Sequence, residues 1–203
     1  KLSNRPKVFV CASAIGFYGN RGEEKLTETS KAGEGFLPEV CVEWEQAAAA
    51  ARALRIRVVS VRIGIVLHPD GGALEQMLPP FKFGVGGKIG SGEQWMSWIH
   101  LDDMVRLLVH AAETPGLEGV LNGVSPNPVR NGEFTQVLGR TVRRPAIIPV
   151  PEFAVKLMFG EMATMVTGSQ RVLPEATLRS GFQFEHENLG PALSNLLSEK
   201  RAE

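Results

Sequence analysis

The chain has 203 residues, 43% of them hydrophobic and 22% charged, which is the composition of an ordinary globular protein with one substantial core. Its 22 acidic and 22 basic residues balance, so no overall field would hold the chain on nucleic acid or on an anionic membrane. No apolar run approaches the roughly 18 residues that a membrane-spanning helix needs.

The first part of the chain alternates between strand-like and helix-like segments. Residues 8–12 are an apolar run typical of a strand buried on both faces, and residues 36–54 have the composition of a helix with a proline in its first turn. Residues 57–65 are rich in β-branched side chains, as strands are. A strand, a crossover helix and a second strand form a βαβ unit, so we expect an α/β fold with a parallel sheet.

Shorter elements are predicted for the rest of the chain. They are, in order, a helix at 73–83, a strand at 96–100, a helix at 102–113, a strand at 119–124, a helix at 131–140, a strand at 146–150 and small helices within 153–172, 175–180 and 189–197. Asp102 and Asp103 are expected to cap the helix that they begin. The composition changes mildly near residue 125, where we expect a sheet domain to give way to a smaller lobe.

The chain lacks a phosphate-binding fingerprint. A doubly wound nucleotide-binding sheet carries its phosphate-binding glycines on the turn after its first strand. No G-x-G-x-x-G or G-x-x-G-x-x-G pattern follows residues 8–12. The loop at residues 84–90 is dense in glycine, but no strand precedes it and no helix opens on its third glycine. We interpret this loop as the rim of a pocket, with a pyrophosphate cradle as the alternative.

The cysteines and histidines predict no metal site. Cys11 lies in a strand-like run and Cys41 in a helix-like one, which is the pattern of buried thiols in a reducing compartment. The four histidines are scattered, and no Cys/His cluster has metal-ligand spacing. The first seven residues contain no apolar signal-like segment. We therefore expect a cytoplasmic protein without a metal.

Several segments taken together resemble the extended short-chain dehydrogenase/reductase superfamily, and more narrowly its epimerase-like branch of uncertain substrate. The segments are 12–19 (ASAIGFYG), 44–48 (WEQAA), 62–67 (RIGIVL), 97–103 (SWIHLDD), 171–174 (RVLP) with Leu178, and 181–184 (GFQF). They cover nearly the whole chain in the family's order. The resemblance implies that residues 1–125 are a Rossmann-like portion and that residues 126–203 are a small, partly helical C-terminal lobe on the substrate side.

The resemblance also places the family's first four strands and its glycine fingerprint before Lys1. We therefore expect this chain to be the C-terminal portion of a Rossmann-like parallel sheet. A half that is made as a separate piece, or a rebuilt fold, are the alternatives.

The superfamily normally does its chemistry with a Tyr-x-x-x-Lys pair, and this chain has none. Its only tyrosine is Tyr18, and the residue four places later is Gly22. Alignment back from Arg62 puts Phe36 at the place of the tyrosine and Val40 at the place of the lysine. Phenylalanine cannot exchange a proton and valine cannot lower a pKa, so the usual acid–base machinery is absent.

Other residues are candidates for the chemistry. The resemblance implies that Ser13, at the end of the first strand, hydrogen-bonds the substrate oxygen; a serine that satisfies a backbone turn is the alternative. Tyr18 is a weaker catalytic candidate, because a tyrosine with an ordinary pKa of about 10 is a poor base. Glu39 and Glu45 are interpreted as solvated carboxylates of the helix, with a catalytic role as the alternative.

The resemblance further implies two sets of ligand contacts. The expected cofactor contacts are Ser13, Ala14, Ile15, Arg62, Gly64, Ile65 and Val66. Gly64 would let the backbone approach the nicotinamide closely, and an ordinary strand-end glycine is the alternative. The expected substrate contacts follow the glycine-dense loop and are Gln94, Trp95, Trp98 and His100; for Trp98 and His100, packing in the core is the alternative.

The sequence and the resemblance support two interpretations of the function. One is an NAD(P)-dependent oxidoreductase or epimerase-like protein acting on an unknown small molecule, with NADP preferred on resemblance alone. The other is a non-catalytic dinucleotide-binding or regulatory protein on the same fold.

The alanine run 47–51 permits close helix–helix approach, and with the resemblance it predicts a homodimer; surface helix propensity is the alternative. The basic cluster Arg140, Arg143 and Arg144 is interpreted as a solvated helix end, so no nucleic-acid or membrane partner is expected.

Overall fold

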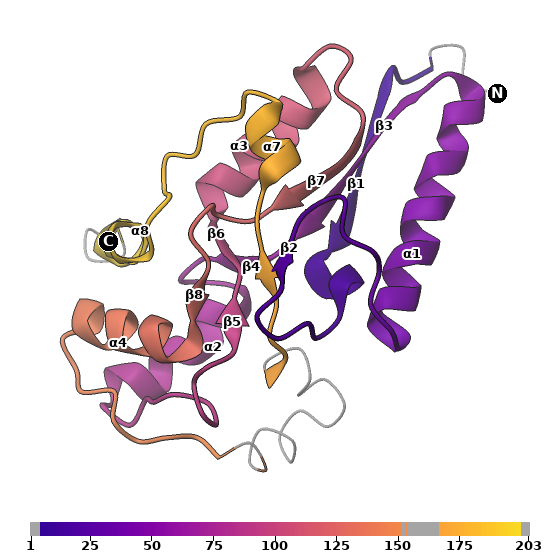
Figure 1. The fold of residues 1–203 in the computed structure, drawn as a ribbon. Helices are drawn as coiled ribbons and strands as arrows, with labels where there is room; N and C mark the ends of the chain where they lie inside the picture. The colour runs from indigo at the N-terminus through magenta and orange to yellow at the C-terminus, as the bar shows by residue number, and fades with distance from the viewer. Residues whose placement is uncertain (1–4, 152, 154–166, 200–203) are drawn as a thin grey trace.

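The computed structural model describes residues 5–151, 153 and 167–199 (Figure 1). Its strands are β1 (Val8–Ala14), β2 (Lys25–Leu26), β3 (Arg57–Ile63), β4 (Ile65–Leu67), β5 (Trp95–Met96), β6 (Trp98–His100), β7 (Gly119–Gly123), β8 (Val129–Arg130) and β9 (Arg171–Val172). Its helices are α1 (Phe36–Ala49), α2 (Gly72–Lys82), α3 (Leu101–Glu113), α4 (Asn131–Val142), α7 (Glu175–Arg179) and α8 (Leu189–Glu199), with the 3₁₀ helices η1 (Ile15–Tyr18) and η2 (Ala50–Leu54). Most of these elements lie where the sequence pattern predicts them.

The main sheet is parallel and has the strand order β1-β3-β7. The chain passes from β1 to β3 through α1, as the expected βαβ unit requires, and Figure 1 shows α1 along one side of the sheet with α3 on the other. Val58, Val59 and Val61 of β3 are at most 1% exposed, because elements pack on both faces of this central strand. The predicted α/β fold class with a parallel sheet is confirmed.

The second predicted strand is divided at Gly64. β3 ends at Ile63, and β4 leaves the main sheet to pair with β6. A Cβ atom on Gly64 would lie 2.5 Å from the carbonyl oxygen of Ser97 and 2.6 Å from Cγ1 of Val124. Only glycine lets the two layers meet this closely, so Gly64 marks the point at which the chain passes from the main sheet into the second part of the molecule.

Short strands from distant parts of the sequence hold that second part together. β4 and β6 pair in parallel, β2 and β9 pair in parallel, and β5 and β8 pair antiparallel. Beneath them, α2, α4 and α8 enclose an apolar cluster centred on Trp98 and Phe134, both fully buried. A separate cluster under α3 forms the core of the main sheet.

Two of the elements predicted from the sequence are wrong where the structure describes their residues. The expected strand at 146–150 is not formed, and only Val150 makes an isolated bridge, to Ile89. Residues 171–172 form β9 and not the end of a helix, while residues 154–166 of that expected helical region lie outside the described residues. The division into two parts at residue 125 stays a prediction. Among the described residues, no helix is both long and apolar enough to cross a bilayer.

Candidate functional site

A row of polar side chains crosses the main sheet near its carboxyl edge. Ser13 of β1 is in register with Arg62 of β3, and Arg62 is in register with Asn122 of β7. Register partners in neighbouring strands point to the same face of a sheet, so the three side chains lie side by side. All three are buried. The carboxyl edge, where open α/β sheets bind their ligands, is therefore built around an internal polar row.

Glu45 of α1 closes over this row. Its two carboxylate oxygens each accept a hydrogen bond from Arg62, from Nε and from Nη2, both at 2.8 Å. Its Oε1 also accepts the hydroxyl proton of Ser13 at 2.8 Å. The Glu45 side chain is only 14% exposed, so its interpretation as a solvated helix carboxylate is wrong. A forked guanidinium–carboxylate pair of this kind is both strong and geometrically specific.

Arg62 is held on its other side by aromatic residues. Its Nη1 donates to the hydroxyl of Tyr18 at 3.0 Å, and its guanidinium carbon lies 3.3 Å from the centre of the Phe17 ring. Burial works against the charged guanidinium, but the hydrogen bonds to Glu45 and Tyr18 outweigh it and raise the pKa of Arg62 on balance. Arg62 therefore stays charged, and each of its three side-chain nitrogens donates a hydrogen bond to Glu45 or Tyr18.

Tyr18 is fully buried at the end of this network. Its hydroxyl donates to Oδ1 of Asn122 at 2.7 Å and accepts from Arg62. Burial raises the pKa of Tyr18, and the charge of Arg62 only partly offsets that effect. Tyr18 is therefore a neutral phenol at physiological pH whose proton is already committed to Asn122.

The expected cofactor contacts fall into two groups. Ser13, Ala14, Ile15 and Arg62 lie together at the carboxyl edge of β1 and β3, whereas Ile65 and Val66 belong to β4. The Ser13 hydroxyl donates to Glu45, so toward a ligand it can act only as an acceptor. The absence of a side chain at Gly64 is already required by the protein's own atoms. The structure thus gives that glycine a physical reason that involves no ligand.

The expected substrate contacts also divide. Trp98 and His100 are buried, and the Trp98 indole donates to the carbonyl oxygen of Asn127. Trp95 is partly exposed and lies between two cations, with the guanidinium carbons of Arg130 and Arg171 at 4.8 and 4.4 Å from its ring centre. Gln94 and Trp95 are thus partly exposed, whereas Trp98 and His100 lie in the core, as the alternative for these two residues had it.

The positions aligned with the missing dyad hold no acid or base. Phe36 is the first residue of α1 and is 77% exposed, and Val40 is partly buried one turn later. Neither side chain belongs to the polar network around Glu45. Chemistry at this edge would therefore have to use Ser13, Glu45 or water.

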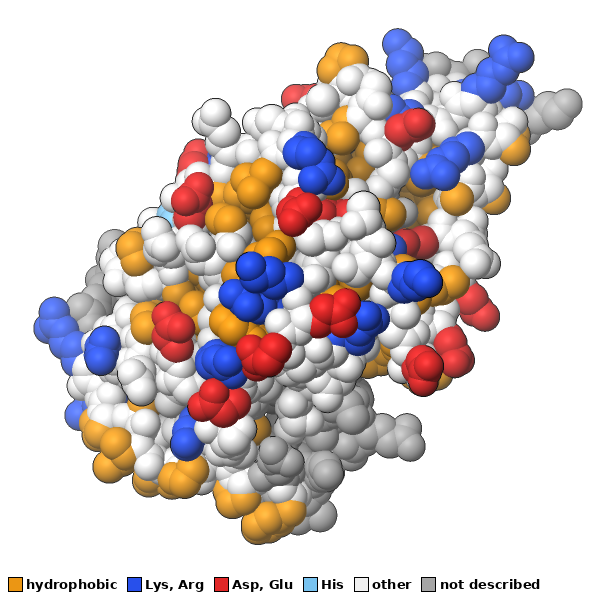
Figure 2. All heavy atoms as spheres, viewed as in Figure 1, with side chains coloured by type: hydrophobic (Ala, Val, Ile, Leu, Met, Phe, Trp, Pro, Cys, Tyr) orange, Lys and Arg blue, Asp and Glu red, His pale blue; other side chains and the backbone are white. Residues whose placement is uncertain are grey.

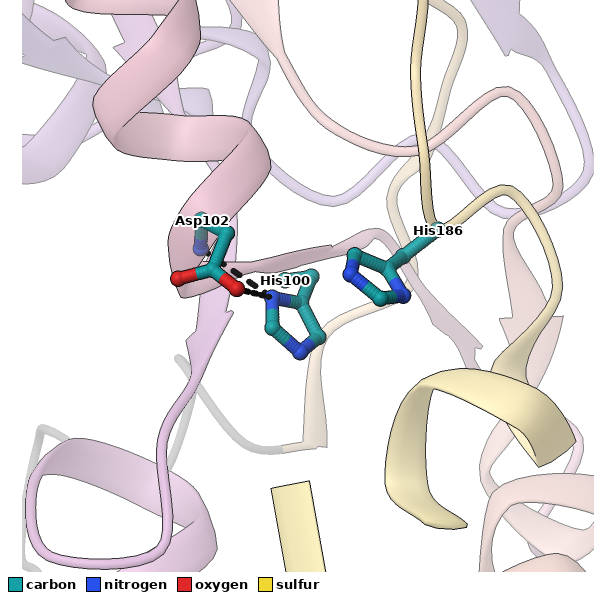
Figure 3. Close-up of side chains that lie close together, drawn as sticks. All are labelled: His100, Asp102 and His186. Atoms are coloured by element: carbon teal, nitrogen blue, oxygen red, sulfur yellow. Dashed lines mark hydrogen bonds and ion pairs between the residues drawn. The ribbon is translucent and has the colours of Figure 1, made fainter. Parts of the chain in front are cut away.

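His100, Asp102 and His186 form a second polar cluster, shown in Figure 3. The two imidazoles are stacked, with ring centres 3.8 Å apart and planes 17° apart. His100 Nδ1 accepts the backbone N–H of Asp102 at 3.0 Å, so His100 Nε2 carries the proton and donates to Oδ1 of Asn195 at 3.0 Å. Burial, followed by the neighbouring His186, lowers the pKa of His100. With both nitrogens of His100 engaged, this arrangement has the geometry of a packed pair and not of a ligand set.

The comparisons with known proteins agree with this architecture. Residues 150–196 match the model of a family described as a domain of unknown function (DUF1731). The chain is 46% identical over 193 residues to the chloroplastic epimerase family protein SDR39U1 homolog of Arabidopsis thaliana. It is 39% identical over 200 residues to the human epimerase family protein SDR39U1, covering 98% of this chain and 68% of the human protein. The chain belongs to the SDR39U1 epimerase family. The resemblance drawn from the sequence is confirmed.

Solved structures extend the comparison. The crystal structure of human SDR39U1 with NADPH superimposes with a TM-score of 0.92, covering 98% of this chain and 68% of that one. A nucleoside-diphosphate sugar epimerase from Corynebacterium glutamicum is 35% identical, with a TM-score of 0.77 and coverage of 95% of this chain and 38% of that one. The match to the Arabidopsis relative covers 95% of this chain but only 55% of that protein. The chain therefore spans only part of the length of this relative.

Two residues of this SDR39U1-family chain lie in environments that the sequence interpretation did not predict. Glu45 is one, because it pairs with Arg62 and is not a solvated helix carboxylate. Asp103 is the other: it is fully buried and accepts hydrogen bonds from Arg106 and from the backbone N–H groups of Glu185 and His186. The expected capping role of Asp102 and Asp103 is wrong, because the N-cap of α3 is His100, but both carboxylates lie in the first turn of α3, where they interact favourably with the helix dipole.

Proposed function

We propose that the protein binds NADP(H) as the C-terminal portion of an epimerase-like oxidoreductase that acts on a small molecule. The observation that carries the proposal is the TM-score of 0.92, at 39% identity, to human SDR39U1 solved with NADPH. Ser13 and Ala14 end β1, and Ile15 begins η1, at the edge where parallel α/β sheets receive their ligands. The phosphate-binding turn is not among these residues, so the described half supplies the nicotinamide and substrate side of the site.

The network suggests how protons would move without a Tyr–Lys pair. The nicotinamide supplies the hydride chemistry when it is bound. Since Ser13 donates its own proton to Glu45, its oxygen is free to accept the proton of a substrate alcohol. A proton that reaches Ser13 would be matched by the transfer of the Ser13 proton to the Glu45 carboxylate. Ser13 and Glu45 would thus replace the missing dyad, with Arg62 holding the carboxylate in place.

A non-catalytic, dinucleotide-binding role is the second candidate, and two observations favour it. Phe36 and Val40 occupy the dyad positions. The hydroxyl protons of Ser13 and Tyr18 are both already donated within the protein. A protein that binds NADP(H) and reports its redox state to a partner would need no proton carrier.

Turnover by the full-length protein and by its Glu45→Gln variant separates the two candidates. We propose that the full-length protein oxidises or reduces some member of a carbonyl and alcohol panel with NADP(H). Glu45→Gln removes the proton acceptor while keeping the shape, so it should lower kcat by about 100-fold or more and leave the Kd for NADPH nearly unchanged. Glu39→Gln, on the exposed side of the same helix, is the matched control and should leave kcat unchanged.

Two other outcomes would decide against the proton relay or in favour of the non-catalytic candidate. Turnover that survives both Ser13→Ala and Glu45→Gln would rule out the proton relay. Tight NADPH binding with no turnover on any compound would support the regulatory candidate. Thermal unfolding of each variant must be measured in parallel, because Glu45→Gln also breaks the buried ion pair with Arg62.

A further inference from the structure

Three arginines gather at the C-terminal end of α4, away from the main sheet. Arg140, Arg143 and Arg144 are exposed and line a shallow hollow of about 430 Å³ together with Pro145 and Ile147. Within the described part of the chain, none of the three forms an ion pair with an acidic side chain. Among the residues that the structure describes, the positive charge of this corner is therefore unpaired, although the net charge of the chain is zero.

Exposed apolar side chains lie on the segment that follows these arginines and beside the segment with which it pairs. The segment 145–150 runs along the glycine-dense segment 84–90: the backbone N–H of Ile148 donates to Gly86, and a Cβ on Gly84 would lie 3.8 Å from Pro145. Three exposed apolar residues lie in the two segments, Val85 (50% exposed), Ile147 (79%) and Ile148 (48%), and Phe83 (83%) comes directly before residue 84. Figure 2 shows hydrophobic side chains along the lower edge of the molecule with basic ones to their left. We call these four residues and the three arginines the basic–apolar face.

The shape and chemistry of this face narrow the choice of partner. The hollow is open to solvent, whereas a small-molecule site encloses most of its ligand. Its apolar residues are mainly aliphatic, whereas single-stranded nucleic acid is bound by aromatic rings that stack on the bases. Exposed Phe and Ile side chains flanked by unpaired arginines match the interface of a bilayer, where apolar groups enter the acyl boundary and arginines meet anionic headgroups.

We propose that the basic–apolar face docks on membrane surfaces that carry anionic lipids. This goes against the expectation drawn from the sequence, which rested on a net charge of zero. Net charge sums over the whole surface, whereas membrane attraction acts within a Debye length of about 8–10 Å and depends on the charges that face the lipid. Arg140, Arg143 and Arg144 are close enough in sequence and space to act together.

Vesicle flotation of the full-length protein tests the proposal. We expect binding to vesicles of phosphatidylcholine with phosphatidylglycerol, little binding to phosphatidylcholine alone, and a loss of binding as NaCl is raised. Each arginine near an anionic surface contributes about a fivefold gain, so Arg140→Gln with Arg143→Gln should lower the partition coefficient about 30-fold. Phe83→Ser with Ile147→Ser should weaken binding even at low salt.

Matched controls lie elsewhere on the molecule. Arg52→Gln with Arg55→Gln removes two exposed arginines near the end of η2, where Arg55 has a positive φ like that of Arg143. Val105→Ser with Val109→Ser removes two exposed apolar residues of α3. Both control pairs should leave vesicle binding unchanged.

Three results would overturn the proposal. They are equal binding to neutral and anionic vesicles, an equal loss of binding in the two arginine pairs, and retention on single-stranded RNA or on an acidic peptide with no binding to lipid. Because the substituted residues are exposed, we expect the variants to unfold at the parent's temperature. If one does not, the salt dependence of the parent protein alone decides the outcome.

Discussion

Close packing inside the protein, and not a ligand, explains why residue 64 is a glycine. A Cβ at this position would overlap the backbone of Ser97 and the side chain of Val124. We therefore expect Gly64→Ala to lower the free energy of unfolding by about 1–3 kcal/mol through overpacking. Chemical denaturation measures the change.

Gly190 provides the control for that prediction. It lies in α8, and a Cβ there would meet only Cγ1 of Val137 at 3.9 Å, an ordinary contact. Gly190→Ala should leave the stability unchanged or raise it by up to about 1 kcal/mol, because alanine favours the helix. A Gly64→Ala variant as stable as the parent would show that β3 and β4 can separate, and the tight passage between the two layers would then be wrong.

The outward face of α1 bears on the predicted homodimer. Phe36, Trp44 and Leu54 are 77%, 54% and 56% exposed, and they recur at helical spacing along α1 and η2 together with the small side chain of Ala47. Large exposed apolar residues on one helix face are typical of an interface. We predict a dimer through this face, and Trp44→Ser should raise its dissociation constant at least tenfold.

Sedimentation velocity over a range of concentrations measures that effect. Val109→Ser, which removes a residue of similar exposure from α3, should leave the dimer intact. A protein that is monomeric at every concentration would contradict the predicted homodimer, and the alanine run would then reflect helix propensity alone.

The segment 181–199 is attached to the rest of the molecule through His100. His100 hydrogen-bonds to Asn195 of α8, stacks on His186, and is faced by Asp102 and Asp103 of α3. Because the pKa of His100 is lowered in the folded protein, its neutral form stabilises the fold fully above its unfolded pKa of about 6.5. That stability is lost as the pH falls from this value through the folded pKa.

We therefore expect the free energy of unfolding to fall below about pH 6.5 and the C-terminal segment to exchange its amide hydrogens sooner than the main sheet. Denaturation at several pH values and hydrogen exchange measure the two effects. His186→Gln removes the neighbouring imidazole that helps to lower the pKa of His100, so it should reduce the pH dependence. A parent protein whose stability is flat from pH 7 to about pH 5 would contradict this role of the stacked pair.

At the scale of the whole molecule, local sequence pattern predicted the long elements well. The apolar run at the start of β1, the β-branched run of β3 and the periodic stripe of α3 are each visible within one short window. The two-residue strands were not predictable, since β2 pairs Lys25 with Arg171, and no local pattern links residues so far apart.

The candidate site shows the same limit. Ser13 and Arg62 could be placed on one sheet edge from their positions at strand ends. Glu45 could not be distinguished from Glu39, because a helical acid becomes buried only if the fold brings a cation to it. The partner that decided the question, Arg62, lies on a different element, 17 residues further along the chain.

The central claim, that this SDR39U1-family protein binds NADP(H) across two halves of a sheet, is tested most directly by titrating NADPH into the full-length protein and into the 203-residue chain. Quenching of protein fluorescence should follow a saturable isotherm for the full-length protein. The chain alone should show no measurable affinity, since its residues include no phosphate-binding turn after the first strand. Saturable binding by the chain alone, or none by the full-length protein, would contradict the account.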